Sequence, residues 1–272
     1  EMKIFKNKLS LRKEINKDKC ISFVPTMGGL HNGHLSLIKK AKLYKCKILV
    51  SIFVNPKQFN KKEDFQKYPR NLKNDIKKLK KLKVSYLYLP SYKDIFDFKP
   101  KNKIFIDNFS KELCGKFRKG HFKGVLNVVN RFLEIIKPKF IYLGFKDFQQ
   151  LTLINLHILK RKINTKVIKC KTVRDINGVA CSTRNFNLNK KQLKIASKVY
   201  QYLSTLKKKV KKGTNIFNAK SIKKDLISLG VDKIDYIENI NINNFRKINN
   251  NLDNINFFIA YYIKNIRLID NI

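Results

Sequence analysis

Two histidines, His31 and His34, are the side chains best placed to do chemistry, and they lie in the stretch Pro25–His34. An apolar run precedes this stretch and a helical pattern follows it, so we predict a strand-to-helix turn. Backbone N–H groups at a helix start attract phosphate, and Gly28 and Gly29 let a ligand approach the backbone closely. Residues three apart share one side of a helical turn. We therefore predict a triphosphate site where both imidazoles donate hydrogen bonds to phosphoryl oxygens.

Two other interpretations of the histidine pair remain open at this point. Histidines three residues apart can be part of a zinc site, which needs a third ligand, and no Cys or carboxylate is close in the sequence. One histidine could instead pack in the core, although two beside a glycine at such a turn fit that explanation poorly. The stretch is not a Walker loop, because the Gly-Lys-Ser/Thr ending is missing.

The elements that must position the histidines alternate between strand and helix signals. Short apolar runs without polar alternation indicate strands buried on both faces, and the periodic segments between them indicate covering helices. Such a chain is typical of an α/β fold with a doubly wound, Rossmann-like parallel sheet. The predicted strands are 20–25, 48–54, 84–89, 140–143 and 167–170, and the predicted helices centre on 35–41, 72–79, 125–135 and 151–159.

The pattern changes near Val173, which predicts a smaller C-terminal α+β domain. We expect a nucleotide-binding domain over 1–173 and a second domain over 174–272. The second contains helical patterns at 196–210 and 219–229, strand patterns at 234–240, 257–263 and 266–269, and an Asn-rich stretch from 239 to 256 that reads as loop.

The net charge is the unusual feature of the composition. Lys and Arg number 61 against 19 Asp and Glu, a formal net charge of +42 over 272 residues. A polyanion-binding surface and a general drift in composition both explain this excess. The lysines are spread along the whole chain, whereas direct base recognition and bidentate phosphate contacts favour arginine. Either way, so positive a field attracts ATP and carboxylate substrates.

The cysteines and the apolar runs bear on the cellular compartment. Five cysteines, an odd number without a Cys-x-x-Cys pair, are expected to be buried free thiols in a reducing cytoplasm. No apolar run approaches the roughly 20 residues that span a bilayer. We also find no secretory signal pattern at the start, and we expect a cytoplasmic protein.

Six further segments, in order along the chain, carry a resemblance to a known family. The His-x-Gly-His stretch resembles that of class I aminoacyl-tRNA-synthetase-like nucleotidyltransferases. Together with the six segments, it resembles the pantothenate synthetase (pantoate–β-alanine ligase) family in particular. The resemblance extends from about Phe23 to Asn271. The six segments are 50–59, 68–70, 120–125, 146–151, 182–185 and 267–271.

The resemblance implies a role for each matching residue. It implies catalytic roles for His34, His31, Lys146 and Arg184. It implies pantoate or β-alanine binding by Gln58, Gln150, Asn55 and His121, and magnesium near Asp75. It implies ATP binding by Pro25, Thr26, Met27, Gly28, Gly29, Leu30, His31, Asn32, Gly33, His34, Gly144, Phe145, Lys146, Asp147, Val173, Cys181, Ser182, Thr183 and Arg184.

Four of these positions carry their own physical argument. Gln58 and Gln150 each follow a predicted strand, where ligands bind in open α/β sheets, and their amides suit the carboxylate and hydroxyls of pantoate. Thr183 keeps the hydroxyl of the family's Ser-Ser-Arg, and with Arg184 it can clamp phosphate while the second domain closes as a lid. Phe145 stands where the family usually has Glu.

The activity that the resemblance implies is ATP-dependent condensation of pantoate with β-alanine through pantoyl adenylate. ATP would enter with Mg²⁺, without a prosthetic group, and the enzyme would be a homodimer. A related nucleotidyltransferase acting on another small acid or phosphate remains an alternative, although Gln58 and Gln150 suit a phosphorylated substrate poorly. A polybasic nucleic-acid-binding protein and a decayed enzyme are the remaining alternatives.

Overall fold

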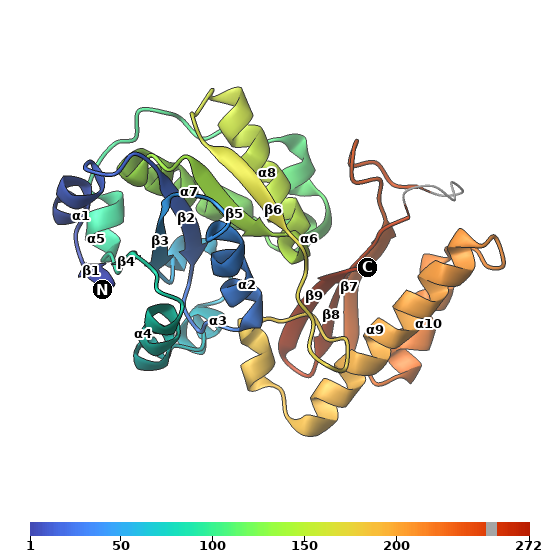
Figure 1. Cartoon of the computed structure of the whole chain (residues 1–272). Coiled ribbons are helices and arrows are strands. Elements are labelled where there is room, and N and C mark those ends of the chain that lie inside the picture. The colour runs from blue at the N-terminus through green and yellow to red at the C-terminus, as the bar shows by residue number, and fades with distance from the viewer. Residues whose placement is uncertain (249–254) are drawn as a thin grey trace. The chain divides into compact units, whose positions relative to one another are not determined.

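The computed structural model describes residues 1–248 and 255–272, which form two compact units (Figure 1). The first unit is Glu1–Thr172 and the second is Val173–Ile272. The boundary lies one residue before the one expected from the sequence. Part of the Asn-rich stretch expected to be loop, residues 249–254, lies outside the described residues.

The first unit is built on a six-stranded sheet in which every pairing is parallel. The strand order is β1-β4-β3-β2-β5-β6. The three strands at the centre are buried along most of their length, so they need covering helices on both faces. The strands are β1 Lys3–Phe5, β2 Ile21–Thr26, β3 Lys47–Ile52, β4 Tyr86–Tyr88, β5 Phe140–Gly144 and β6 Lys166–Cys170.

Helices cover both faces of this sheet, as the doubly wound prediction requires (Figure 1). Side chains of α2 and α4 share one core cluster with Val24 and Val50. On the opposite face Phe23 packs against Phe132 of α7, with ring centroids 5.5 Å apart. The helices are α1 Lys8–Ile15, α2 Asn32–Ala41, α3 Lys62–Gln66, α4 Leu72–Lys81, α5 Tyr92–Phe96, α6 Leu113–Phe117, α7 His121–Ile136 and α8 Phe148–Lys160, with 3-10 turns η1 Pro56–Gln58, η2 Asn108–Lys111 and η3 Phe145–Asp147.

The sheet contains one strand that the sequence pattern did not predict. β1 is three residues long, pairs with β4 at the sheet edge and exposes two of its three residues. So short an edge strand has no buried face to leave an apolar pattern. The five predicted strands match β2 to β6 within a few residues.

The second unit packs helices against a three-stranded antiparallel sheet of order β7-β8-β9. β8 is buried at six of its seven residues and shares a core cluster with α9 and α10. An α+β unit was expected here. Its elements are η4 Thr183–Asn187, α9 Lys190–Lys211, α10 Ala219–Ser228, β7 Lys233–Asn239, β8 Phe257–Ile263 and β9 Ile266–Asn271.

The expectation of five free thiols is wrong for Cys20 and Cys46, which form a disulfide. The sheet register explains the pair. Ile21 of β2 lies opposite Lys47 of β3, so the two preceding cysteines enter adjacent strands side by side, with Cα atoms 5.0 Å apart. Cys114 and Cys170 are buried free thiols, and Cys181 is a partly exposed one.

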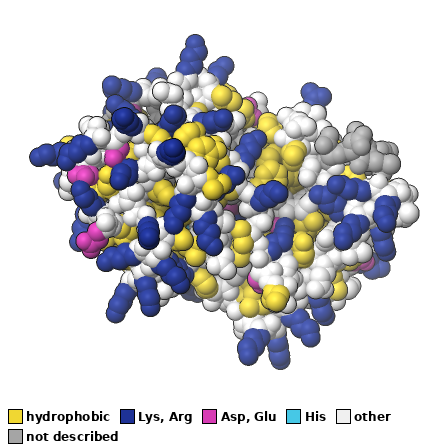
Figure 2. All heavy atoms as spheres, in the orientation of Figure 1, with side chains coloured by type: hydrophobic (Ala, Val, Ile, Leu, Met, Phe, Trp, Pro, Cys, Tyr) yellow, Lys and Arg dark blue, Asp and Glu magenta, His cyan; other side chains and the backbone are white. Residues whose placement is uncertain are grey.

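The lysine excess is dispersed over the surface in view. Figure 2 shows Lys and Arg side chains scattered over both units on this face, with few acidic groups between them. They form no continuous stripe on it of the kind that follows a nucleic-acid backbone. Within the described residues, no helix is long and apolar enough to cross a membrane.

Candidate active site

Two groups of predicted site residues in the first unit follow the adjacent strands β2 and β5, between which the strand order of the sheet reverses. From β2 the chain builds β3 and β4 on one side, then crosses to add β5 and β6 on the other. Ligands bind in open parallel sheets beside the loops that follow two such adjacent strands, here β2 and β5. Pro25–His34 occupies the end of β2, and Gly144–Gln150 occupies the end of β5.

The two histidines cap helix α2 with their own rings. His31 is the N-cap residue, and its Nδ1 accepts from the backbone N–H of Gly33 at 3.1 Å. His34 Nδ1 accepts from the backbone N–H of His31 at 3.4 Å, which completes a capping box. Because each Nδ1 is an acceptor, each neutral ring carries its proton on Nε2. Both rings thus keep an Nε2–H donor that the cap does not use.

The surroundings keep both rings neutral. Burial lowers the pKa of His31 to about 2, and the positive charges of Lys146 and Lys78 add to this effect. Burial, again with Lys146 and Lys78, lowers the pKa of His34 to about 4. The rings lie 4.0 Å apart, centroid to centroid. At neutral pH the helix start therefore combines two uncharged donors with two neighbouring lysines, an arrangement suited to a polyphosphate.

The glycine turn before α2 is held by a buried carboxylate from α4. Gly28 and Gly29 have positive φ angles of 81° and 62°, which favours glycine at both positions. Asp75, 1% exposed, accepts from the N–H of Gly29 and of Leu30, each at 2.8 Å. Both carboxylate oxygens thus hold the loop in shape. The predicted contact of Asp75 with magnesium stays a prediction.

Lys78 is a residue that the sequence analysis missed. Its Nζ donates to the backbone carbonyl of Leu30 at 2.5 Å, and its charge is felt by both histidines. It lies three residues after Asp75 on α4, on the same face of the helix. That spacing was the signal available in the sequence, hidden among many other lysines.

A second group of polar residues forms around the 3-10 turn η1 after β3. Asn55, 1% exposed, donates from Nδ2 to Gln58 Oε1 at 3.1 Å and to the carbonyl of Gly124 at 3.2 Å. Gln58 Nε2 contacts Met27 Sδ at 3.2 Å, which links η1 to the loop after β2. A Cβ on Gly124 would lie 2.2 Å from the carbonyl oxygen of Lys57, so only glycine permits this approach of α7.

His121 and Arg118 hold the backbone of Gln58 from the start of α7. His121 Nδ1 donates to the Gln58 carbonyl at 2.7 Å, and Arg118 Nη2 donates to the same oxygen at 3.1 Å. His121 Nε2 then accepts from Arg118 Nη1 at 3.1 Å. His121 was predicted to bind substrate, and the structure places it, 8% exposed, where it positions Gln58.

The two glutamines after β5 have different surroundings. Gln149 is buried; its Oε1 accepts from Cys114 N at 3.0 Å, and its Nε2 donates to the carbonyls of Phe109 and Glu112, both at 2.7 Å. Gln150 is half-buried, and its side-chain amide has no hydrogen bond to the described part of the chain. Gln150, the residue predicted to bind pantoate, is therefore the one with an amide to offer.

The loop after β5 places a lysine and an aspartate near His31. Lys146 is largely buried and lies 3.4 Å from the Asp147 carboxylate. The charges of both residues reach His31. Phe145, which replaces the family's usual Glu, packs its ring 5.2 Å from that of Phe148. This side chain is part of an aromatic contact.

The predicted phosphate clamp lies in the second unit. Ser182 Oγ accepts from the backbone N–H of Arg184 at 3.3 Å and so caps η4. Thr183 is 4% exposed, and Val173 accepts from the N–H of Cys181 at 2.9 Å. Arg174, not predicted, holds Asp270 through two bonds of 2.6 and 2.9 Å and so ties this segment to β9.

The zinc interpretation of the histidine pair lacks a third ligand. No group of three or more His, Cys, Asp or Glu side chains suited to a metal occurs in residues 1–248 or 255–272. In addition, Nδ1 of each ring is already engaged by a backbone N–H.

A doubly wound parallel sheet with His-x-Gly-His at the start of the helix after its central strand is typical of a class of α/β nucleotide-binding enzymes. Comparison with known proteins gives the family. Residues 3–272 match the pantoate-beta-alanine ligase family, and the chain belongs to that family.

Individual relatives agree with this assignment. A pantothenate synthetase of Francisella tularensis subsp. mediasiatica is 42% identical over 266 residues, covering 96% of this chain and 92% of the relative. The structure of the Francisella tularensis pantoate-beta-alanine ligase, described as complexed with beta-gamma ATP and beta-alanine, has a TM-score of 0.85 at 41% identity and covers 100% of this chain and 97% of that one. The pantothenate synthetase of Thermus thermophilus has a TM-score of 0.92 at 28% identity, covering 100% and 99%. The predicted family and fold class are thus confirmed.

Proposed function

We propose that this protein joins pantoate to β-alanine with ATP, by way of pantoyl adenylate, and releases AMP and pyrophosphate. The observation that carries the proposal is the pair of neutral histidines at the start of α2, whose Nε2–H donors stand beside Lys78 and Lys146. Family membership supports the same substrates, and so does the Francisella complex, which is described as containing an ATP species and beta-alanine.

In the first step a pantoate carboxylate oxygen attacks the α-phosphorus of ATP. Negative charge grows on the phosphoryl oxygens and on the leaving pyrophosphate. Preorganised donors stabilise such charge without reorganising during the reaction. His31 and His34 donate through Nε2–H while Lys146 and Lys78 supply positive charge. Arg184 of the second unit, with Ser182 and Thr183, is the proposed clamp on the phosphates.

In the second step the β-alanine amine attacks the acyl carbon of pantoyl adenylate, and AMP leaves. AMP is a far better leaving group than the oxide that a free carboxylate would have to expel. No enzyme nucleophile is required, so catalysis depends on orientation. Gln58 and Gln150 orient pantoate, with Asn55 and His121 fixing Gln58. Magnesium enters as the ATP complex. A homodimer and closure of the second unit over ATP also belong to this proposal.

The test is incubation of the protein with ATP, Mg²⁺, pantoate and β-alanine, followed by detection of AMP and pantothenate. Formation of both in equal amounts supports the proposal. Pyrophosphate release with a phosphorylated acid but not with pantoate would instead identify the protein as another nucleotidyltransferase. Omitting β-alanine in a single-turnover experiment should leave pantoyl adenylate on the enzyme.

A further inference from the structure

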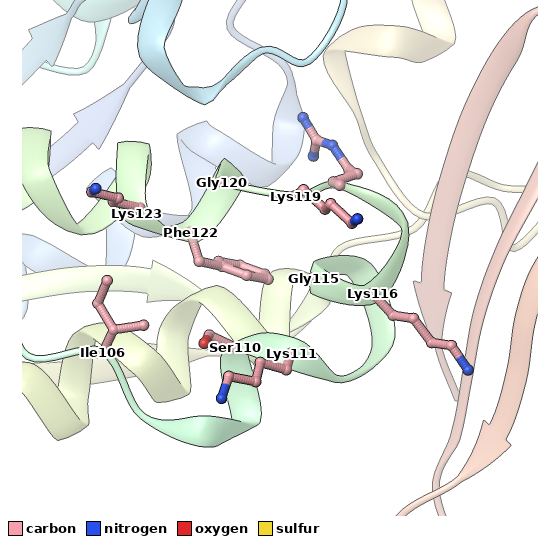
Figure 3. Close-up of a pocket in the computed structure, with 10 residues that line it drawn as sticks. Ile106, Ser110, Lys111, Gly115, Lys116, Lys119, Gly120, Phe122 and Lys123 are labelled. Carbon is pink, nitrogen blue, oxygen red and sulfur yellow. The ribbon is translucent and has the colours of Figure 1, made fainter.

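A pocket lies beside the start of α7, and half of its ten lining residues are cationic. It has a volume of about 330 Å³ and is formed by residues between η2 and the first turn of α7 (Figure 3). Lys111, Lys116, Arg118, Lys119 and Lys123 supply five positive charges, and no acidic residue lines it. No ion pair within the described residues engages any of the four lysines.

The wall of the pocket is built by the packing of two short elements. A Cβ on Gly115 would lie 1.6 Å from the Ser110 carbonyl oxygen, so α6 and η2 meet backbone against backbone. Phe122, 5% exposed, forms the inner side with Ser110, while the lysines extend from the rim (Figure 3). Four like charges around one pocket repel one another, and a bound anion would reduce this repulsion.

The pocket and the substrate residues use different sides of α7. His121 faces η1, where it holds the Gln58 carbonyl. Phe122 and Lys123 are the next residues along the helix, and their side chains leave it in other directions. Gln58 is therefore not among the residues that line the pocket.

We propose that this pocket binds a small anion with at least two phosphoryl groups. A single phosphate would leave most of the lysine charge uncompensated, and the volume lies at the small end of ligand pockets, which span about 300–1,000 Å³. A nucleic acid would need an extended groove. The diphosphate group could belong to free pyrophosphate or to a nucleotide, whose base would lie against Phe122 and Ile106.

Arg118 connects this pocket to Gln58. It lines the pocket, and its Nη2 also donates to the Gln58 carbonyl. An anion that draws Arg118 away loosens one of two bonds to that oxygen. The occupied pocket should therefore raise the KM for pantoate, an effect that rests on the proposed function.

The test is lysine acetylation footprinting of the whole chain, read by mass spectrometry, with inorganic pyrophosphate as the probe. Pyrophosphate should protect Lys111, Lys116, Lys119 and Lys123, while exposed Lys39 serves as the internal reference. Lys111→Gln with Lys123→Gln should weaken protection of the remaining two lysines by about tenfold or more, since each charge-assisted bond is worth about that factor. The matched pair Lys42→Gln with Lys45→Gln removes the same charge from other exposed positions, keeps the Lys39 reference and should leave protection unchanged.

The outcomes of the experiment distinguish free pyrophosphate from a nucleotide as the ligand, and the pocket from the proposed ATP site at α2. Protection by ADP at lower concentration than pyrophosphate supports the pocket and points to a nucleotide, whereas the reverse order points to free pyrophosphate. Equal protection of Lys39, or equal weakening by both double variants, means diffuse charge and overturns the proposal. Loss of protection in His34→Ala with no effect of the pocket variant also overturns it. The footprint needs no turnover, so failure of the proposed function would leave it interpretable.

Discussion

The starts of helices α2 and α7 use histidine in opposite ways. At α2, both rings accept a backbone N–H at Nδ1, and both Nε2–H groups remain outside the cap. At α7, His121 donates from Nδ1 to Gln58 and accepts at Nε2 from Arg118, so both nitrogens are used within the fold. The same side chain is thus a proposed ligand donor in one place and a positioning group in the other.

The difference follows from what caps each helix. α2 begins with a capping box in which His31 and His34 each accept a backbone N–H. These bonds fix the tautomer of each ring and leave its Nε2 proton outside the cap. α7 begins at Gly120, which has φ of 78° and no side chain, so His121 is free to reach across to η1. The distinction between binding and positioning therefore depends on the hydrogen-bond partners of each ring.

The largest expected effect tests the α2 side of the comparison. His34→Ala removes an outward Nε2–H donor and should slow formation of pantoyl adenylate by about 10²-fold or more. The measurement is rapid-quench analysis of a single turnover with labelled ATP. His34→Gln serves as control, because glutamine can rebuild the capping box; it should keep the melting temperature but not the rate. An unchanged rate in His34→Ala would remove the catalytic role.

The next prediction uses neighbouring glutamines with different partners. Gln149→Ala leaves the N–H of Cys114 and the carbonyls of Phe109 and Glu112 without their amide partner. It should lower the free energy of unfolding by about 1–3 kcal/mol, because three hydrogen bonds of a buried amide are lost while the Phe109 and Glu112 carbonyls keep backbone N–H partners. Urea denaturation measures the loss.

Gln150→Ala is the matched control for that experiment. It should leave unfolding nearly unchanged and raise the KM for pantoate by about tenfold, the worth of one or two hydrogen bonds to substrate. If Gln149→Ala instead raised KM with unchanged stability, the two assignments would have to be exchanged.

Sequence patterns predicted the α2 side far better than the α7 side. Pro25–His34 is continuous in the chain, so its strand, turn and helix cap can be inferred locally. The bonds that fix Gln58 come from His121 and Arg118, about 60 residues later, and no local pattern encodes them. The Cys20–Cys46 pair likewise needs the β2–β3 register. β1 was missed because its three residues carry no periodicity.

A smaller effect should follow from loosening the α7 side. His121→Phe keeps the ring volume but removes both hydrogen bonds, leaving Arg118 as a partner of the Gln58 carbonyl. We expect KM for pantoate to rise by about fivefold, because one buried hydrogen bond is worth about 0.5–1.5 kcal/mol, with KM for ATP nearly unchanged. Steady-state kinetics with each substrate varied in turn would show this. A fall in kcat with unchanged KM would point instead to direct participation of His121 in the reaction.

The smallest effect is a pH dependence of stability that comes from the α2 histidines. Their pKa values are lowered to about 2 and about 4 from 6.5, first by burial. The unfolded chain therefore binds more protons than the folded one below pH 6.5, so their contribution to stability is complete above 6.5 and declines as pH falls toward the folded values. His157, buried with a pKa near 4 and bonded to Asn130, adds to the same slope. Between pH 6.5 and 5, above the range where ordinary carboxylates titrate, the free energy of unfolding should fall as the pH falls. The double variant His31→Asn with His34→Gln should make this slope shallower, and His157 should account for the slope that remains. A slope equal to that of the unmodified protein would mean that the α2 rings titrate normally and that the neutral-donor arrangement is wrong.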